Sequence, residues 1–369
     1  MIQLKSYFTF ILLAFVVLSI GCDKDDDDAP AYNIPSIYSF ENVSYSGQTQ
    51  RLSMLNELKS YMNTANTSGI VLDATRMKAM YANDAANAQW AGNYDDSKQL
   101  KSKTFEGVRS DFEALMDEMA VASQSTTAGS EGVSGVIESA DGTKQYLVGD
   151  DGVEYTQLIE KGLMGACLFY QSTAVYFGDD KMNVDNEVVE EGEGTAMAHH
   201  WDEAFGYFGV PIDFPTSTDG LFFWGNYCNG RDALLNTNQL AMDGFLKGRA
   251  AISNGDLDTR NGAIAEVRNA WELVTVGTAL HYLNSGIANF DDMALRSHSL
   301  SEAIAFVYAI QFNPTKQIDN QAVSDLLTLI AGSADFSSMN LYNANLANLQ
   351  KAKDDLAAAY GLEAQKDEF

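Results

Sequence analysis

The chain has 369 residues, of which 46% are hydrophobic, and this is enough apolar material for a sizeable buried core. Its 51 Asp and Glu residues outnumber its 23 Lys and Arg residues, and the formal net charge at pH 7 is −28. Nucleic-acid binding depends on Lys and Arg side chains that neutralise phosphates, so we expect no nucleic-acid partner. The acidity is spread along the chain, which favours solubility and a weak attraction for divalent cations.

Residues 1–21 have the pattern of a bacterial secretory signal peptide. Lys5 supplies a positive charge, and the apolar stretch 8–20 is too short for a comfortable transmembrane helix. Ser19-Ile20-Gly21-Cys22 resembles a lipobox, so we expect Cys22 to carry a lipid that anchors the protein to a membrane. An ordinary cleaved signal followed by a chance cysteine is the alternative.

Residues 22–37 are expected to form an acidic, disordered tether, because the like charges of the run at 23–28 repel one another. This run resembles the acidic export signal of some Bacteroidetes lipoproteins that reach the outer face of the outer membrane. We therefore predict an outer membrane lipoprotein. Whether it faces the cell surface or the periplasm stays open.

The sequence that follows the tether has helical periodicity. Apolar residues recur at three- and four-residue steps within 52–62, 77–81 and 97–122. From 123 to 153 the composition changes to Gly, Ser and Asp with short β-branched pieces, which predicts an insertion that can form a hairpin. Helical patterns then resume, separated by short Gly and Asn breaks, over 154–177, 187–208, 230–248, 256–284, 291–310, 318–332 and 338–360.

These patterns predict an all-α fold, in which 38–369 forms one helical domain made of helical bundles. Two halves, 38–209 and 210–369, are candidate related bundles, because a short internal echo links them. His199-His200-Trp201-Asp202-Glu203-Ala204 can be laid over His298-Ser299-Leu300-Ser301-Glu302-Ala303. A chance match between two short segments is the alternative.

All four histidines lie between residues 199 and 298. On a helix, His199 and His200 each share a face with Glu203, and His298 shares one with Glu302. An imidazole and a carboxylate at this spacing can take two corners of a zinc or iron site. The candidate metal ligands are His199, His200, Glu203, His281, His298 and Glu302. The alternative is a hydrogen-bonded His–Glu pair at a bundle interface.

Complete catalytic motifs are absent from the sequence. It contains no His-Glu-x-x-His, Gly-x-Ser-x-Gly or Cys-x-x-Cys pattern and no Gly-rich phosphate loop, so we predict no catalytic residues. Cys167 and Cys228 can form a disulfide in an oxidising envelope or stay buried as thiols. Arg268 and Glu272 have the i, i+4 spacing of a solvated salt bridge.

The segment from Ala198 to Ala204 resembles the Gly-x-His-x-x-Glu motif of imelysin-like (M75 peptidase-like) proteins, with Ala198 in place of the glycine. That family consists of exported, helical bacterial proteins with two bundles and an association with iron uptake. The resemblance implies that His200 and Glu203 are metal ligands. A larger part of the chain, 38–310, resembles a DUF4856-like group of Bacteroidetes lipoproteins of unknown function. Its landmarks here are Tyr45-Ser46-Gly47-Gln48-Thr49-Gln50-Arg51, the His-His-Trp-Asp-Glu segment, Ala270-Trp271-Glu272 and His281-Tyr282-Leu283-Asn284.

The leading functional hypothesis is an imelysin-like lipoprotein of the cell envelope that helps to acquire iron or a related metal. It would bind iron, zinc or a metal-carrying ligand, contact the membrane through a lipid on Cys22, and work with an envelope protein partner. One alternative is a metal-dependent peptidase with its metal at His200 and Glu203. The other is a non-catalytic surface protein that binds a protein or glycan partner.

Overall fold

The computed structural model describes residues 31–369 of the chain. The expected signal peptide, the expected lipidation site Cys22 and most of the expected acidic tether therefore lie outside the described residues. The chain divides into two compact units, of which the second, Ile34–Phe369, contains every helix described below. This unit begins slightly before the expected start at residue 38, because Ile34 already packs against the core. The expected halves 38–209 and 210–369 stay a prediction.

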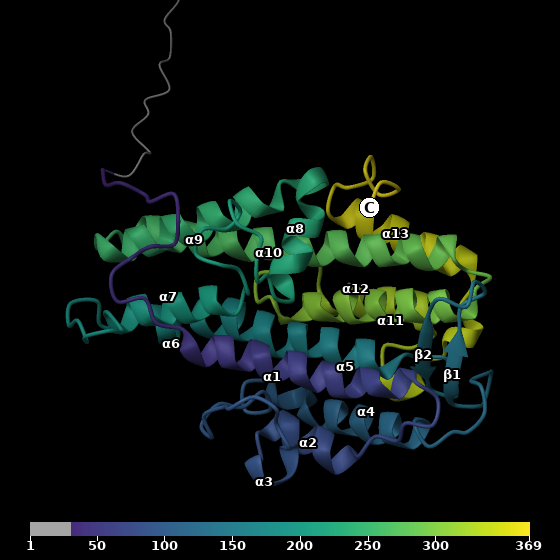
Figure 1. Cartoon of the computed structure of the whole chain (residues 1–369). Helices are drawn as coiled ribbons and strands as arrows, with labels where there is room; N and C mark the ends of the chain where they lie inside the picture. Colours follow the sequence, from purple (N-terminus) through teal and green to yellow (C-terminus); the bar gives the residue numbers. More distant parts are fainter. Residues whose placement is uncertain (1–30) are drawn as a thin grey trace, which may run out of the picture. The chain divides into compact units, whose positions relative to one another are not determined.

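The predicted all-α fold is confirmed, because helices form nearly all the regular structure of the described residues (Figure 1). The α-helices are α1 (Ser46–Asn63), α2 (Ala74–Ala82), α3 (Ala85–Ala88), α4 (Arg109–Ala122), α5 (Tyr155–Leu163), α6 (Asp179–Met182), α7 (Ala196–Gly206), α8 (Trp224–Leu235), α9 (Thr237–Ser253), α10 (Leu257–Ala288), α11 (Met293–Ala309), α12 (Asn320–Ala331) and α13 (Leu346–Ala359). Short 3₁₀ turns occupy Thr64–Asn66, Glu106–Val108, Ile310–Phe312, Phe336–Ser338 and Leu341–Asn343. The strands are β1 (Gly135–Glu138) and β2 (Gln145–Val148).

A buried helix runs through the middle of the Ile34–Phe369 unit. It starts as α5 and continues as π-helical turns over Met164–Phe169 and Gln171–Tyr176. Every residue from 155 to 169 is buried, because α1, α4 and α11 all pack against this helix. Small residues allow the close approach, since a Cβ atom on Gly165 would lie 2.6 Å from the Cβ atom of Ala309. A helix of 22 residues spans roughly 30 Å, so its two ends present separate sites.

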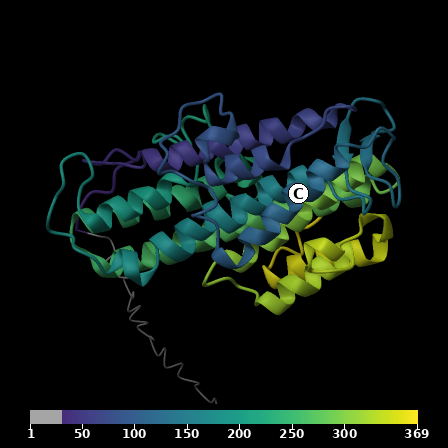
Figure 2. The ribbon, with the colours of Figure 1, turned by 90° about the horizontal axis from the view of Figure 1, so that it is seen from below.

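The remaining helices extend outward from this central helix in contacting layers. On one side α11 packs against α5, α10 against α11, and α9 against α10 (Figure 1). On the other side lie α1 and α4, followed by α2. The C-terminal helices α12 and α13 pack against α11 and α10 respectively, and Figure 2 shows this pair beside the layered helices.

Large aromatic side chains fill the space between these layers. Trp271 of α10 lies with its ring centroid 4.7 Å from that of Phe208 and 5.9 Å from that of Trp224. All three are fully buried. The aromatic-rich stretch that follows α7 therefore serves mainly as core, and its burial stabilises the fold through the removal of apolar surface from water.

The insertion predicted near 123–153 forms a β-hairpin. Its two strands pair antiparallel with Gly135 opposite Val148 and Glu138 opposite Gln145. The hairpin packs against α11 through a small apolar cluster that joins Ile137 and Val148 to Ala294. The hairpin is thereby attached to the N-terminal end of α11.

Several predicted helical stretches are helical only in part. Residues 187–195 form a loop in which Gly192 and Gly194 have positive φ angles, and α7 begins only after the cap residue Thr195. Four exposed glutamates in this segment, Glu187, Glu190, Glu191 and Glu193, make a continuous helix unfavourable through mutual repulsion. In 97–122 the α-helix covers only Arg109–Ala122, and Glu106–Val108 just before it forms a short 3₁₀ turn.

Candidate functional site

The first His/Glu group lies on α7. Thr195 caps this helix, because its side chain accepts a hydrogen bond from the backbone N–H of Ala198. This cap residue lies four positions before His199, and the helix begins at Ala196. The spacing then places both imidazoles beside the same carboxylate, with His200 Nδ1 3.2 Å and His199 Nε2 3.8 Å from Glu203 Oε2.

Two residues from other helices hold the opposite oxygen of the Glu203 carboxylate. Gln48 of α1 donates a hydrogen bond of 2.8 Å to Glu203 Oε1, and the Tyr176 hydroxyl donates one of 2.9 Å to the same atom. Burial by itself raises the pKa of Glu203, but hydrogen bonds from His200 and Gln48, the charge of His199 and the Tyr176 hydroxyl outweigh it and lower the pKa to about 2. The carboxylate is therefore ionised at neutral pH, and Oε2 faces the two histidines.

The acidic loop before α7 also approaches this group. Glu193 Oε2 lies 3.9 Å from His199 Nε2, with 54% of the Glu193 side chain exposed. The His199, His200 and Glu203 side chains keep 24%, 17% and 18% of their surface exposed, so a small ion has access to all of them. Among residues 31–369, however, no three or more His, Cys, Asp or Glu side chains are already arranged to hold a metal ion.

The second His/Glu pair repeats the local geometry in a different environment. His298 Nε2 lies 3.6 Å from Glu302 Oε1, but only 5% of the Glu302 side chain is exposed. Lys161 Nζ lies 3.6 Å from the same Glu302 oxygen and 2.8 Å from Glu160. The cation that faces Glu302 thus comes from the chain itself, and a metal would have to displace the buried Lys161.

The structure separates the six predicted ligands into three places. His199, His200 and Glu203 lie near the C-terminal end of the central helix, where Tyr176 is located. His298 and Glu302 lie near its N-terminal end, where Glu154 is located. His281 of α10 is apart from both groups: burial and the charge of Arg231 lower its pKa, and its hydrogen bond is with the backbone of Phe369.

Sequence reasoning missed the residues that complete each group. Gln48 and Tyr176 are 155 and 27 positions from Glu203 in the sequence, and no spacing rule connects them. Gln48 appeared only within a family landmark segment. Glu193 was placed in a helix instead of a loop, so its approach to His199 was not expected.

The described structure also tests the expected salt bridge of Arg268 and the expected alternatives for the two cysteines. Arg268 does not pair with Glu272, because its guanidinium donates to the backbone oxygens of Thr173 and Phe177. Cys167 and Cys228 are both buried free thiols, so no disulfide joins them.

The fold and these side chains define a class: an all-helical protein with a β-hairpin insertion and two His/Glu pairs at opposite ends of a buried central helix. Within this class the chain belongs to the family described as "Domain of unknown function (DUF4856)", whose model matches residues 35–363. The resemblance to a DUF4856-like group is therefore confirmed, whereas the wider imelysin-like relationship stays a prediction. No curated protein and no solved structure matches the chain. No helix within residues 31–369 has the length and apolar character needed to cross a membrane.

Proposed function

We propose that the protein is an exported, lipid-anchored envelope protein that binds a divalent transition metal at His199, His200 and Glu203 and takes part in metal acquisition. The observation that carries the proposal is the convergence of two imidazole nitrogens on the same oxygen of an ionised carboxylate, within 3.2 and 3.8 Å. The imelysin-like motif, the expected signal peptide and the expected lipid on Cys22 support the envelope role.

The distances are close to those of a metal site. A tetrahedral ion with bonds of about 2.1 Å separates its ligand atoms by about 3.4 Å. His200 Nδ1 already lies 3.2 Å from Glu203 Oε2, and His199 Nε2 lies 3.8 Å from the same oxygen. Metal binding would require a contraction of a few tenths of an ångström on the His199 side and an approach of the two imidazole nitrogens to a similar separation. Gln48 and Tyr176 would orient the carboxylate from behind, as outer hydrogen bonds do in many metal sites.

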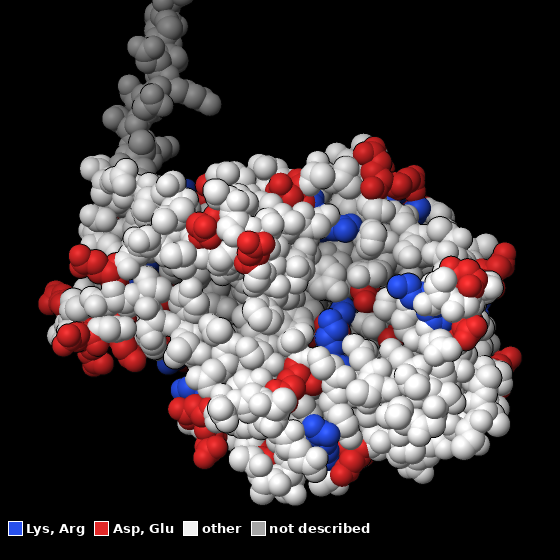
Figure 3. Space-filling view, viewed as in Figure 1, with Lys and Arg blue, Asp and Glu red and all other residues white. Residues whose placement is uncertain are grey.

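The acidic loop can supply a fourth ligand. Glu193 is exposed, lies in a loop with two positive-φ glycines, and is already 3.9 Å from His199 Nε2. Figure 3 shows Asp and Glu atoms gathered over this loop between α6 and α7, which raises the local concentration of cations. Two imidazoles with one or two carboxylates suit Zn²⁺ and Fe²⁺ better than Ca²⁺ or Mg²⁺, which prefer oxygen ligands alone.

A peptidase function receives less support from the site. Glu203 is hydrogen-bonded on both oxygens, so its carboxylate is held in place and is not free to act as a general base. The arrangement favours binding over hydrolysis. Iron or zinc acquisition is therefore the leading role, and a metal-carrying ligand can replace the free ion as cargo.

Elemental analysis, calorimetry and thermal melts with Fe²⁺, Zn²⁺ and Cu²⁺ test the proposal. The protein should bind about one metal per chain and melt at a higher temperature when loaded. The double variant His200→Ala/Glu203→Ala should lose both effects, whereas His281→Ala, which removes a distant histidine, should keep them. Glu193→Gln should weaken affinity by about tenfold, and Glu190→Gln in the same loop should not.

Two results would reject the site. The first is an unchanged metal stoichiometry in the double variant, because the ligands would then lie elsewhere. The second is the absence of any binding or thermal shift in the native protein. That second result would point to a structural role for the histidines and to a protein or glycan partner.

A further inference from the structure

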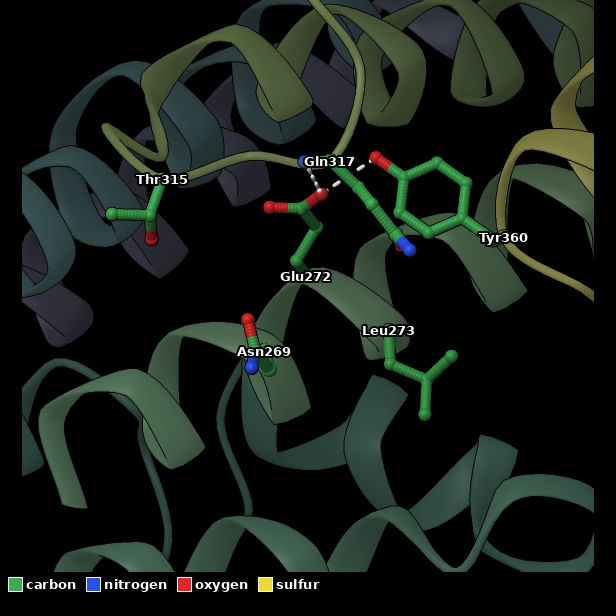
Figure 4. Close-up of a pocket in the computed structure, with 6 residues that line it drawn as sticks. All are labelled: Asn269, Glu272, Leu273, Thr315, Gln317 and Tyr360. Atoms are coloured by element: carbon green, nitrogen blue, oxygen red, sulfur yellow. Dashed lines mark hydrogen bonds between the residues drawn. The ribbon is translucent and has the colours of Figure 1, made fainter. Parts of the chain in front are cut away.

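A second candidate binding site lies beside α10, where the loop after Pro314 and the end of α13 approach this helix. Six residues line a cavity of about 360 Å³ there: Asn269, Glu272, Leu273, Thr315, Gln317 and Tyr360 (Figure 4). They come from α10, from the loop after Pro314, and from the end of α13. The cavity is open to solvent, and its floor includes the carboxylate of Glu272, a residue that is only 4% exposed.

The Glu272 carboxylate receives hydrogen bonds from neutral donors only. Its Oε1 atom accepts from the backbone N–H of Gln317 at 2.8 Å and from the Tyr360 hydroxyl at 2.6 Å. Its Oε2 atom accepts from the side-chain amide of Asn313. Burial and the negative charge of Glu272 raise the pKa of Tyr360, so the hydroxyl keeps its proton and remains a donor. Three hydrogen-bond donors thus surround the two oxygens of this carboxylate.

Glu272 differs from every other buried carboxylate of the described residues in its lack of a cationic partner. Glu154 pairs with His298, Glu160 with Lys59 and Lys161, Asp202 with Arg249, and Glu302 with Lys161 and His298. Within residues 31–369, no Lys, Arg or His nitrogen lies within 4.0 Å of Glu272. Arg268, one turn away on the same helix, is turned toward the backbone of Thr173 and Phe177.

A buried anionic charge without a counter-charge is unfavourable, because the low dielectric does not replace its hydration. Here the unpaired charge lies at the floor of an open cavity and not inside sealed core. The geometry points to a binding site for the ammonium group of an alkylamine, which would enter the cavity and supply the missing positive charge to Glu272.

The other cavity walls suit the same ligand. Figure 4 shows the Asn269 amide and the Thr315 side chain on the side of Glu272 that faces away from Tyr360. An amide and a hydroxyl oxygen accept hydrogen bonds, so they can receive the two ammonium protons that do not face the carboxylate. Leu273 offers apolar surface to an alkyl stem. The ligand is either a free small amine or the side chain of a lysine in a peptide, because both present the same ammonium group.

Calorimetry and thermal melts of the full chain with three probes test this inference. The probes are 1,4-diaminobutane, Nα-acetyl-lysine N-methylamide and, as an uncharged control, 1-butanol, all at matched ionic strength. Saturable binding of one or both amines, with a rise in melting temperature and no effect of butanol, is expected. Stronger binding of the diamine would indicate a free amine as ligand, and stronger binding of the lysine derivative would indicate a peptide side chain.

Three variants make the test specific. Glu272→Gln removes the charge with little change of shape and should weaken amine binding by about tenfold or more. Glu266→Gln, an exposed neutralisation on the same helix that faces Lys247, should leave binding unchanged. Asn269→Lys, one turn before Glu272, should place the chain's own ammonium in the cavity, raise the melting temperature without ligand, and abolish amine binding.

The Asn269→Lys variant keeps the inference testable if Glu272→Gln does not fold, because it leaves the Glu272 hydrogen bonds intact. Amine binding that is absent, equal in Glu272→Gln, or matched by butanol would overturn the inference. An Asn269→Lys variant that melts below the native protein would also overturn it, since a cation at this place would then not be favourable.

Discussion

The Nδ1 atom of His298 lies 2.7 Å from the Oε2 atom of Glu154, a side chain with no exposed surface. The same imidazole stacks on the ring of Tyr146 in β2, with the centroids 4.4 Å apart. Burial by itself lowers the pKa of His298, but the hydrogen bond with Glu154 and the charges of Glu154 and Glu302 outweigh it and raise the pKa. One titratable side chain thus connects the hairpin, α11 and the residue that precedes α5.

This arrangement predicts a loss of stability at alkaline pH. Because the pKa of His298 is higher in the folded state, its contribution is complete below about pH 6.5 and is lost as the pH rises through the folded value. We expect the urea midpoint of unfolding to decrease as the pH rises from about 6 to about 9. The variant His298→Gln should show a smaller decrease with pH, and its free energy of unfolding at pH 6 should be lower by about 3 kcal/mol. His281→Gln is the control. The pKa of His281 is lowered in the folded state, so its effect on stability changes as the pH falls and not as it rises. An equal alkaline slope in His298→Gln would contradict the prediction.

The buried pair of Asp202 and Arg249 predicts a second effect on stability. Arg249 Nε donates to Asp202 Oδ1 at 2.8 Å, and the Tyr38 hydroxyl donates to the same oxygen at 2.7 Å. Arg249→Met leaves a fully buried carboxylate without its cation and should destabilise by about 3–5 kcal/mol. The double variant Arg249→Met/Asp202→Leu should recover part of that loss. A double-mutant cycle by chemical denaturation measures the coupling, and additive effects would show that the pair is not coupled.

Two helical glycines predict opposite outcomes of the same substitution. A Cβ atom on Gly248 of α9 would lie 2.0 Å from the buried indole of Trp201, so Gly248→Ala should destabilise by at least about 1–3 kcal/mol. Gly262 of α10 has no atom within 4 Å of its added Cβ position, so Gly262→Ala should stabilise by up to about 1 kcal/mol through helix propensity. Urea denaturation of both variants measures the change in the free energy of unfolding. A stabilising Gly248→Ala would mean that α9 and α7 are less closely packed than described.

The two buried cysteines predict slow thiol chemistry. Burial raises the pKa of the Cys167 thiol to about 12 and also raises the pKa of Cys228. Because the thiolate is the reactive form, native protein that lacks residues 1–30 should show negligible labelling by a thiol reagent over minutes. Unfolding in the absence of reductant should release both thiols. A failure to detect them under those conditions would indicate a disulfide instead.

The hairpin and the acidic loop show which parts of the fold a local sequence pattern predicts and which parts it does not. The hairpin was recognisable because Gly and Asp turns interrupt short β-branched stretches. The loop at 187–195 was misread as helix, because its apolar Val188 and Val189 fit a helical spacing although both are exposed. Exposure depends on neighbours, and a single sequence does not reveal which neighbours a segment will have.

The two His/Glu pairs illustrate the same limit at the site. Their spacing predicted that each imidazole would lie near its carboxylate, and the structure places both pairs within 4 Å. The spacing did not reveal that Lys161 faces Glu302 while an accessible loop glutamate faces His199. One pair therefore has a cation from the chain itself, whereas the other lies beside an exposed acidic loop.

The sequence by itself determined the helical class of this protein, the position of its hairpin, and the two His/Glu pairs within single helices, because all of these depend on contacts between residues close in the chain. Only the tertiary structure decided which carboxylates have a cationic partner. Glu203 meets Gln48, Glu302 meets Lys161 and Glu272 meets no cation within the described residues, because the packing of sequence-distant helices sets these distances. Electrostatic pairing between distant helices is therefore a property of the fold and not of the local sequence.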